Sequence, residues 1–565
     1  MPGGGQLALV AVGAQNTALN GNPDKTLFYQ VIQRHTHFAA ENIGIQLDGP
    51  NELMPDQQIR LRAKIPRHAD LLTGLTFVFQ LPAIYSKIWM LPPPTGQQEP
   101  QIRAPSFRWI HQIGAHIIAS ASIYISGTKV QEFPGEWIAA RATCDYTPDA
   151  YQKWRNMVGD VPELTEPEWG IYGRSTNYPY AAGIYPHNVW DPSGANFATA
   201  PSIPAREIRV PLPFWFTETL GHALPLVSLQ LHEVEVQLTL RSLHELYRIN
   251  DPIFNADPCR PGQRLIPNPA WPTSNEPTAV PPIYDNLTLQ NAYASWNDPI
   301  GTLNNYFQPA TANPMTTLAT IGSAFNLNAS LEGQYIYVTE REQAMFAERA
   351  LQTPVRQVQQ FTFPSVVAKT RLDLDVHGPL TRLIFLGRRS DAIQSRNDYV
   401  NCSNWKSLSQ APFWPIPSAS PTVPVPNSGR LINYYSVRDT IQSVRLLVAG
   451  NELYEEKDAP FYELWTPFAT ASGQGVAGVG PATSGGQKPD HVFGPLYQFP
   501  FALQGSNYDQ PTGTLNASRI REVQLEIAPT SLDPNGFYVY DVTVFAETIN
   551  FLRFQNGMGG LVWAV

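Results

Sequence analysis

Apolar and polar residues alternate through a stretch near residue 120, and a looser copy of this stretch returns far downstream. In residues 117–125 the odd positions hold isoleucine or alanine, and serine or tyrosine fills most even positions. This period of two predicts a β-strand. A glycine follows the strand in each copy, Gly127 and Gly450, where a turn needs a residue that tolerates positive φ. Polar residues then lead to aromatic ones, and the copies end at Trp137 and Trp465.

The spacing of the two copies indicates a duplicated domain. Aligning the glycines gives an offset of 450 − 127 = 323 residues, whereas solenoid repeats have periods of roughly 20 to 50 residues. A second pair of similar segments, residues 72–78 and 380–386, is offset by 380 − 72 = 308 residues. The two offsets are close, so we interpret both as one duplication with loops of unequal length.

The same alternation predicts most of the remaining elements. In residues 224–240 the apolar phase changes near His232 and Glu233, which predicts a β-bulge there. A helix is expected at residues 340–350. The expected strands are 58–63, 75–81, 117–125, 206–216, 224–240, 334–338, 357–363, 371–376, 380–386, 522–527 and 538–554.

These elements predict an all-β fold of two tandem eight-stranded jelly rolls with long loop insertions and few short helices. Among 565 residues, 53 prolines and 39 glycines favour strands and stiff loops over helices. We expect an N-terminal arm at 1–25, a first jelly roll at 26–350 and a second at 351–565. The first jelly roll is expected to carry insertions at about 144–202 and 242–330.

Composition narrows the functional classes. A net charge of −9 argues against broad contact with nucleic acid, which rewards lysine and arginine facing phosphate. Cys144, Cys259 and Cys402 are too few and too scattered for a disulfide framework or a zinc site, which favours a reducing compartment. No apolar run reaches the roughly 20 residues that span a bilayer, and the start lacks the features of a secretory signal. We therefore expect a soluble chain.

Two clusters could carry chemistry. His35 and His37 would share a strand face, but a zinc site normally needs three or four protein ligands, so we interpret them as surface or interface residues. Glu163, Glu166 and Glu168 could supply a carboxylate pair for acid–base catalysis, although their spacing fits a solvated loop better.

Other motifs are interpreted as structural. Residues 473–478 fit GxGxxG, yet Pro481 follows where the dinucleotide fingerprint requires a helix. Cys144 precedes Asp145, but no base is placed to activate the thiol. Four triplets fit the N-glycosylation pattern and, without a secretory signal, are interpreted as chance matches: Asn286, Asn328, Asn401 and Asn516.

Taken in order, a series of motifs resembles the double jelly-roll major capsid proteins of the nucleocytoplasmic large DNA viruses, nearly from end to end. The motifs lie at residues 6–15, 21–23, 34–38, 126–130, 135–137, 210–216, 223–227, 232–235, 510–520 and 557–561. The sequence departs from the family at Leu515, where cysteine is frequent, and at Ala517, where an aromatic residue or methionine is frequent. The two insertions of the first half are also longer than in the smaller members.

The resemblance implies a structural tile. Its homotrimers would form pseudo-hexagonal capsomers of an icosahedral shell that encloses a membrane-bounded genome, assembled in the host cytoplasm. The implied partners are other copies, minor capsid and penton proteins and, through the arm, the inner membrane. It implies no catalytic residue, no metal, no cofactor and no direct contact with nucleic acid.

One alternative from another class stays open, a carbohydrate-binding or carbohydrate-cleaving β-sandwich protein. Aromatic residues between 172 and 190 could form a sugar platform. A hydrolase would need two carboxylates roughly 5 to 10 Å apart in a cleft, and the sequence shows no convergent pair. A DNA-packaging role is disfavoured by the charge balance.

Overall fold

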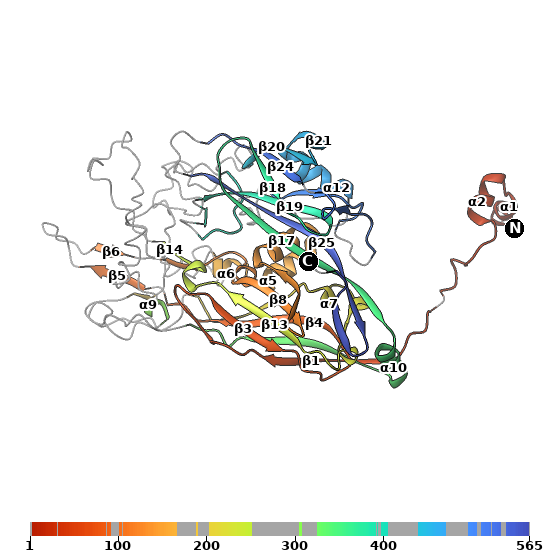
Figure 1. Ribbon diagram of the computed structural model, residues 1–565, viewed down its shortest axis with the longest axis horizontal. Helices are drawn as coiled ribbons and strands as arrows, with labels where there is room; N and C mark the ends of the chain where they lie inside the picture. The colour runs from red at the N-terminus through yellow and green to blue at the C-terminus, as the bar shows by residue number, and fades with distance from the viewer. Residues whose placement is uncertain are drawn as a thin grey trace.

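The computed structural model has two β-sandwiches that lie against each other, with an N-terminal arm that extends away from them (Figure 1). The structure describes residues 3–30, 32–85, 87–91, 101–103, 106–165, 188–189, 203–250, 304–307, 325–390, 392–393, 397–404, 439–470, 495–505, 510–520, 522–532 and 538–563.

The first sandwich consists of two antiparallel sheets, which we name 1A and 1B. Sheet 1A has the order β1 (Phe38–Gln46), β16 (Ser330–Val338), β4 (Leu71–Leu81) and β11 (Arg206–Pro211), with β12 (Leu224–Pro225) also paired to β4. Sheet 1B has the order β3 (Ile59–Lys64), β13 (Val234–Leu240), β8 (Ile118–Ile125) and β9 (Thr128–Phe133).

The second sandwich repeats this arrangement in sheets 2A and 2B. Sheet 2A has the order β17 (Leu351–Val366), β25 (Tyr540–Gln555), β19 (Pro379–Arg389) and β22 (Tyr497–Pro500), with β23 (Leu515–Asn516) and β26 (Met558–Leu561) at its margins. Sheet 2B has the order β18 (Thr370–Leu374), β24 (Val523–Pro529), β20 (Ile441–Val448) and β21 (Asn451–Asp458). If the eight main strands of each half are counted along the chain, both halves have the orders 1-8-3-6 and 2-7-4-5, the jelly-roll topology. The predicted double jelly roll is confirmed.

The hairpins β8–β9 and β20–β21, which lie in the two similar stretches, have the same type of turn. Ser126 and Gly127 have φ of 50° and 80°, and Ala449 and Gly450 have φ of 50° and 77°. Two consecutive residues of positive φ between antiparallel strands are typical of a type I′ turn, which matches the right-handed twist of the strands. The predicted role of both glycines is therefore confirmed.

The other pair of similar segments shares a β-bulge. In sheet 1A, Thr73 is the extra residue between the pairs Leu72–Tyr335 and Gly74–Gln334. In sheet 2A the register shifts in the same way at Thr381, which precedes the pair Arg382–Glu547. Each threonine hydroxyl donates to a main-chain carbonyl of the neighbouring strand, at 3.3 Å to Gln334 and at 2.8 Å to Glu547. The bulge therefore aligns the halves residue by residue.

Short helices connect the strands. In the first half they are α3 (Ile113–His116), α4 (Gly135–Asp145), α5 (Pro148–Met157), α6 (Pro162–Thr165), α7 (Trp215–Glu218), α9 (Asn304–Phe307) and α10 (Glu340–Glu348), the last as predicted. In the second half a π-helical turn (Phe461–Trp465) continues into α12 (Thr466–Thr470). The arm holds α1 (Gly4–Val10) and α2 (Ala14–Asn20), which contain no buried residue. No helix in the described ranges is long and apolar enough to cross a membrane.

Smaller sheets lie at the end of the first sandwich where β14 and α9 are labelled (Figure 1). They pair β5 (Lys87–Leu91) with β6 (Gln101–Arg103) and β10 (Asn188–Val189), β7 (Ser106–Trp109) with β14 (Tyr247–Asn250), and β2 (Glu52–Leu53) with β15 (Phe325–Asn326).

Two predicted strands need correction. Residues 224–240 are not one bulged strand, because a 3-10 turn (Leu226–Ser228) follows β12 and regular pairing resumes only at Val234. Leu231 is 72% exposed and donates its main-chain N–H to Gly557 O near the C-terminus. The phase change thus reflects a loop that meets the chain end. The strand predicted at 206–216 ends at Pro211, and α7 begins at Trp215.

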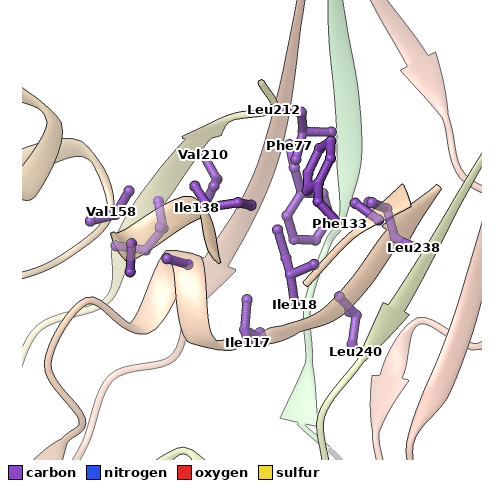
Figure 2. Close-up of a cluster of buried hydrophobic side chains, with 14 of the residues drawn as sticks. Phe77, Ile117, Ile118, Phe133, Ile138, Val158, Val210, Leu212, Leu238 and Leu240 are labelled. Carbon is purple, nitrogen blue, oxygen red and sulfur yellow. The ribbon is translucent and has the colours of Figure 1, made fainter. Parts of the chain in front are cut away.

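The hydrophobic core of the first half extends onto the second. Between sheets 1A and 1B, Phe77 lies near Phe133 and Leu238, while Ile138 of α4 lies near Val210 (Figure 2). The same cluster includes Val355, Ile384, Leu386, Phe545 and Phe554, all of sheet 2A. A separate cluster fills the interior of the second sandwich. Sheet 2A is therefore buried on both faces.

Candidate functional site

The sequence-predicted candidates do not converge on one site. Cys144 is buried at the end of α4, and burial raises the pKa of its thiol. Its neighbour Asp145 accepts hydrogen bonds from Arg382. Glu163 lies in α6, whereas Glu166 and Glu168 fall outside the described residues.

The two histidines lie in the extended segment before β1. The Nδ1 atom of His35 is 2.8 Å from Thr36 O. Within the described ranges, no three His, Cys, Asp or Glu side chains gather in a way that could hold a metal ion. The GxGxxG stretch at 473–478 lies outside the described residues, as do Cys259, Asn286 and most of 172–190.

Buried charged groups of both halves converge at the joint between the two jelly rolls. Trp137 of α4 donates its indole N–H to Glu547 Oε1 of β25 at 2.8 Å. The second oxygen of Glu547 accepts from Arg382 Nε at 2.6 Å. The two terminal nitrogens of Arg382 also donate hydrogen bonds to the two carboxylate oxygens of Asp145, at 2.6 and 2.8 Å. A fully buried carboxylate of the second half is thus held by an indole of the first half and an arginine that bridges to α4.

Two further arginines extend this network around Trp137. Arg356 of β17 donates to Glu218 at 3.1 Å, and Arg141 of α4 lies 3.2 Å from the other oxygen of the same carboxylate. Both guanidinium carbons approach the Trp137 ring, at 5.5 and 5.7 Å from its centroid. Among the residues that the structure describes, three carboxylates of this network therefore face three guanidiniums.

A second cluster lies at the other end of α4. Glu136 accepts from Arg241 at 2.9 Å and from Arg388 of β19 at 3.4 Å. Burial alone would raise the pKa of Glu136, but the two guanidiniums lower it to about 2. Arg241 also bonds Glu245, whose carboxylate accepts from the Tyr399 hydroxyl at 3.3 Å.

A buried histidine completes this cluster. The His116 ring stacks on Tyr399 of the second half, with centroids 5.1 Å apart. Burial lowers its pKa to about 3, so the imidazole is neutral at ordinary pH. Such a ring can pack against arginines without adding like charge.

The joint favours one arrangement of the sandwiches. Desolvating charged groups is costly, so a buried ionic network adds little net stability compared with an apolar contact. Removing one partner is nevertheless strongly destabilising, because it leaves an uncompensated buried charge. The network therefore penalises any other relative placement of α4 and sheet 2A.

Two family models match the two halves. Residues 26–262 match the "Major capsid protein N-terminus" and residues 336–560 match the "Large eukaryotic DNA virus major capsid protein". The major capsid protein of Chrysochromulina ericina virus is 23% identical over the full length of both chains. That of Paramecium bursaria Chlorella virus 1 is 21% identical over 99% of each. The chain belongs to the major capsid proteins of large eukaryotic DNA viruses.

Solved structures agree on the fold of this capsid protein. A chain of PBCV-1 VP54 has a TM-score of 0.57 at 16% identity, with 96% of this chain and 100% of that chain covered. The Faustovirus major capsid protein has a TM-score of 0.56 at 14% identity, with 96% and 94% covered. The relatives are structural proteins of virus capsids, and the protein is a capsid component.

Sequence reasoning missed the joint of this capsid protein. Arg382 and Glu547 lie in predicted strands, where a charged residue amid apolar ones could have indicated a buried partner, whereas Arg388 lies beyond the end of the predicted strand 380–386. Arg382 stands where the first half has Gly74, so comparison of the two similar segments contained that signal. The start of α5 could also have been predicted from the sequence, because Thr147 caps the helix and Pro148 is its first residue.

Proposed function

We propose that the protein is the tile of an icosahedral shell and acts as a homotrimer, in which six jelly rolls form a pseudo-hexagonal capsomer. The observation that carries this is the duplication, because two sandwiches of identical strand order lie in one chain with a hydrogen-bonded ionic joint between them. Closed homo-oligomers are the commonest assemblies of soluble proteins, and three copies of a doubled unit give a near-sixfold outline. The role is structural and not catalytic.

The mass of the purified chain in solution tests the trimer. Light scattering at several concentrations should give a species of about three times 62.8 kDa that does not change on dilution. A monomer at every concentration would contradict the homotrimer.

The chain divides, in this proposal, into an arm at 1–25, a first jelly roll at 26–350 and a second at 351–565. The division agrees with the elements, because α10 ends at Glu348 and β17 begins at Leu351. The arm meets the inner side of the shell, where neighbouring capsomers, minor capsid and penton proteins or the inner membrane receive it. Assembly takes place in the host cytoplasm.

Exposed apolar side chains support this role for the arm. Leu7, Leu9, Val10 and Leu19 of the two arm helices are between 73% and 86% exposed, and Phe28 is 98% exposed. Such residues are costly in water unless a partner covers them.

Deleting residues 1–24 should leave trimers intact and impair shell formation, because the arm contributes no buried residue to either sandwich. Light scattering would follow the trimers, and electron microscopy of co-expressed shell components would follow the shells. Normal shells from the truncated chain would contradict the arm's role.

A further inference from the structure

The joint inside the chain is a contact between two different surfaces. On one side are β9 and α4, the edge strand of sheet 1B and the helix that follows it. On the other side is the outer face of sheet 2A, where Glu547 accepts from Trp137 of α4 and Arg382 donates to Asp145 of α4. Because the surfaces differ, this contact can be repeated from one jelly roll to the next.

The outer face of sheet 1A corresponds to this outer face of sheet 2A, but among the described residues no element packs on it. The shared bulge aligns β4 with β19, and the strand pairing then places Gln334 where the second half has Glu547. The same register aligns Ala40 of β1 with Arg356 of β17, and Asn42 with Val358. Ala40, Asn42 and Gln334 are exposed, whereas their counterparts lie at the joint.

Part of this face carries small side chains. Gly44 lies on the same side of β1 as Ala40 and Asn42, and Gly74 stands where the second half has the long Arg382 side chain. Gly74 and Gln334 stand where the second sheet has Arg382 and Glu547, and the exposed Glu332 nearby is paired with Arg209. Such a surface can receive aromatic rings without burying an unpaired charge.

The second half, in turn, has the docking element, and the part of the chain that the structure describes leaves Trp465 and Phe468 of this element exposed. The segment after β21 is residues 461–470, the counterpart of α4, which follows β9. Its Leu464, Trp465 and Phe468 are 48%, 56% and 84% exposed. Phe461 and Trp465 stack with ring centroids 4.9 Å apart. In the first half, by contrast, Trp137 of α4 is fully buried.

We propose that residues 461–470 of one copy, with the adjacent β21, dock on the outer face of sheet 1A of a second copy. The contact between copies then repeats the contact inside the chain, with an aromatic surface on amides in place of the ionic network. This inference rests on the proposed trimer and specifies which surfaces form it. Head-to-tail contacts of this kind close into a ring, here of six jelly rolls from three copies.

Phe468, which is more exposed than Leu464 and Trp465, is the best position at which to test the interface. In the full chain, Phe468→Asp should weaken association by about 30-fold or more, as for a central aromatic anchor of an interface, and so shift the light-scattering mass towards the monomer. Phe28→Asp is the matched control, since the same change is made at a still more exposed residue of the arm. It should leave the mass unchanged.

Pairing of unlike surfaces is tested by cross-linking. Leu464→Cys and Asn42→Cys would be placed in separate chains that also carry Cys259→Ser, then co-expressed and treated with a short bismaleimide. Cys144 and Cys402 are buried and should not react. The proposal expects a cross-linked dimer from the mixture and none from either variant alone.

The outcomes separate this inference from the trimer itself. A stable trimer that Phe468→Asp does not weaken, and that gives no mixed cross-link, would overturn the inference and leave the trimer standing. Cross-links within the Leu464→Cys variant alone would mean a symmetric contact and would also overturn it. A wild-type chain that is monomeric throughout would instead contradict the trimer.

Discussion

Sheets 1A and 2A have the same strand order and the same bulge, but their outer faces differ. In sheet 2A the outward residues Ile384, Leu386 and Phe545 are fully buried against the first half. In sheet 1A the positions aligned with Ile384 and Phe545 hold Thr76 and Glu332, and the Glu332 side chain is 38% exposed. The outer face of sheet 2A thus forms the internal joint, whereas the outer face of sheet 1A faces away from the chain. The side chains differ accordingly, because those of sheet 2A pack against the first half and those of sheet 1A do not.

The largest difference between the two sheets should appear at Arg382, the position aligned with Gly74. Arg382→Ala leaves Glu547 buried without its arginine, and we expect a loss of about 3 to 5 kcal/mol in the free energy of unfolding. Urea unfolding measured by fluorescence would report it. Lys64→Ala, which removes a solvent-exposed ion pair with Glu233, is the control and should leave the midpoint unchanged. An equal effect of both changes would show that the joint contributes no more than a surface pair.

Substitutions at Trp137 and Trp465 compare the buried helix α4 with the exposed segment 461–470. Trp137→Phe keeps an aromatic ring but removes the N–H that Glu547 accepts, which should cost about 2 kcal/mol because a buried carboxylate loses a partner. Trp465→Phe makes the same change at a half-exposed ring that holds no buried carboxylate in the described chain, and it should lower the unfolding midpoint less. The two variants, measured side by side by urea unfolding, contradict the comparison if their midpoints fall equally.

The sequence predicted the fold well where strands are buried on one face, because alternation then records which side meets the core. Strands exposed on both faces carry no such record. Strand β21 reads Asn-Glu-Leu-Tyr-Glu-Glu-Lys-Asp, is exposed at all but one position and was not predicted as a strand. Strand β1, exposed over most of its length, was missed in the same way. An edge strand needs charge more than alternation to avoid unwanted pairing.

The joint could not be predicted from the sequence for a different reason. Its pairs connect residues far apart in the chain, such as Trp137 with Glu547 and Asp145 with Arg382. Local periodicity does not encode such distances. The repeated segments did fix which strands correspond, and only the packed structure shows that Arg382 reaches across to α4.

The smallest effect concerns His116, which lies in the same joint among Glu136, Arg241, Arg388 and Asp398 and stacks on Tyr399. Burial lowers its pKa from 6.5 to about 3, so between these values the unfolded chain binds one more proton than the folded chain. Its contribution to stability is therefore complete above pH 6.5 and declines as the pH falls towards 3, by up to about 1.4 kcal/mol per pH unit.

His116→Phe preserves the stacked ring and removes this titration. We expect the variant to lose less stability than the wild type between pH 7 and pH 5, measured as the difference in urea midpoint at the two pH values. Comparison of the two proteins at pH 7, where the imidazole is neutral in the folded chain and largely so in the unfolded one, isolates any change in packing. Parallel pH profiles would mean that solvent reaches His116 and that the joint opens more readily than its buried contacts with sheet 2A indicate. A flattened profile would assign the acid sensitivity to the internal contact in which His116 lies.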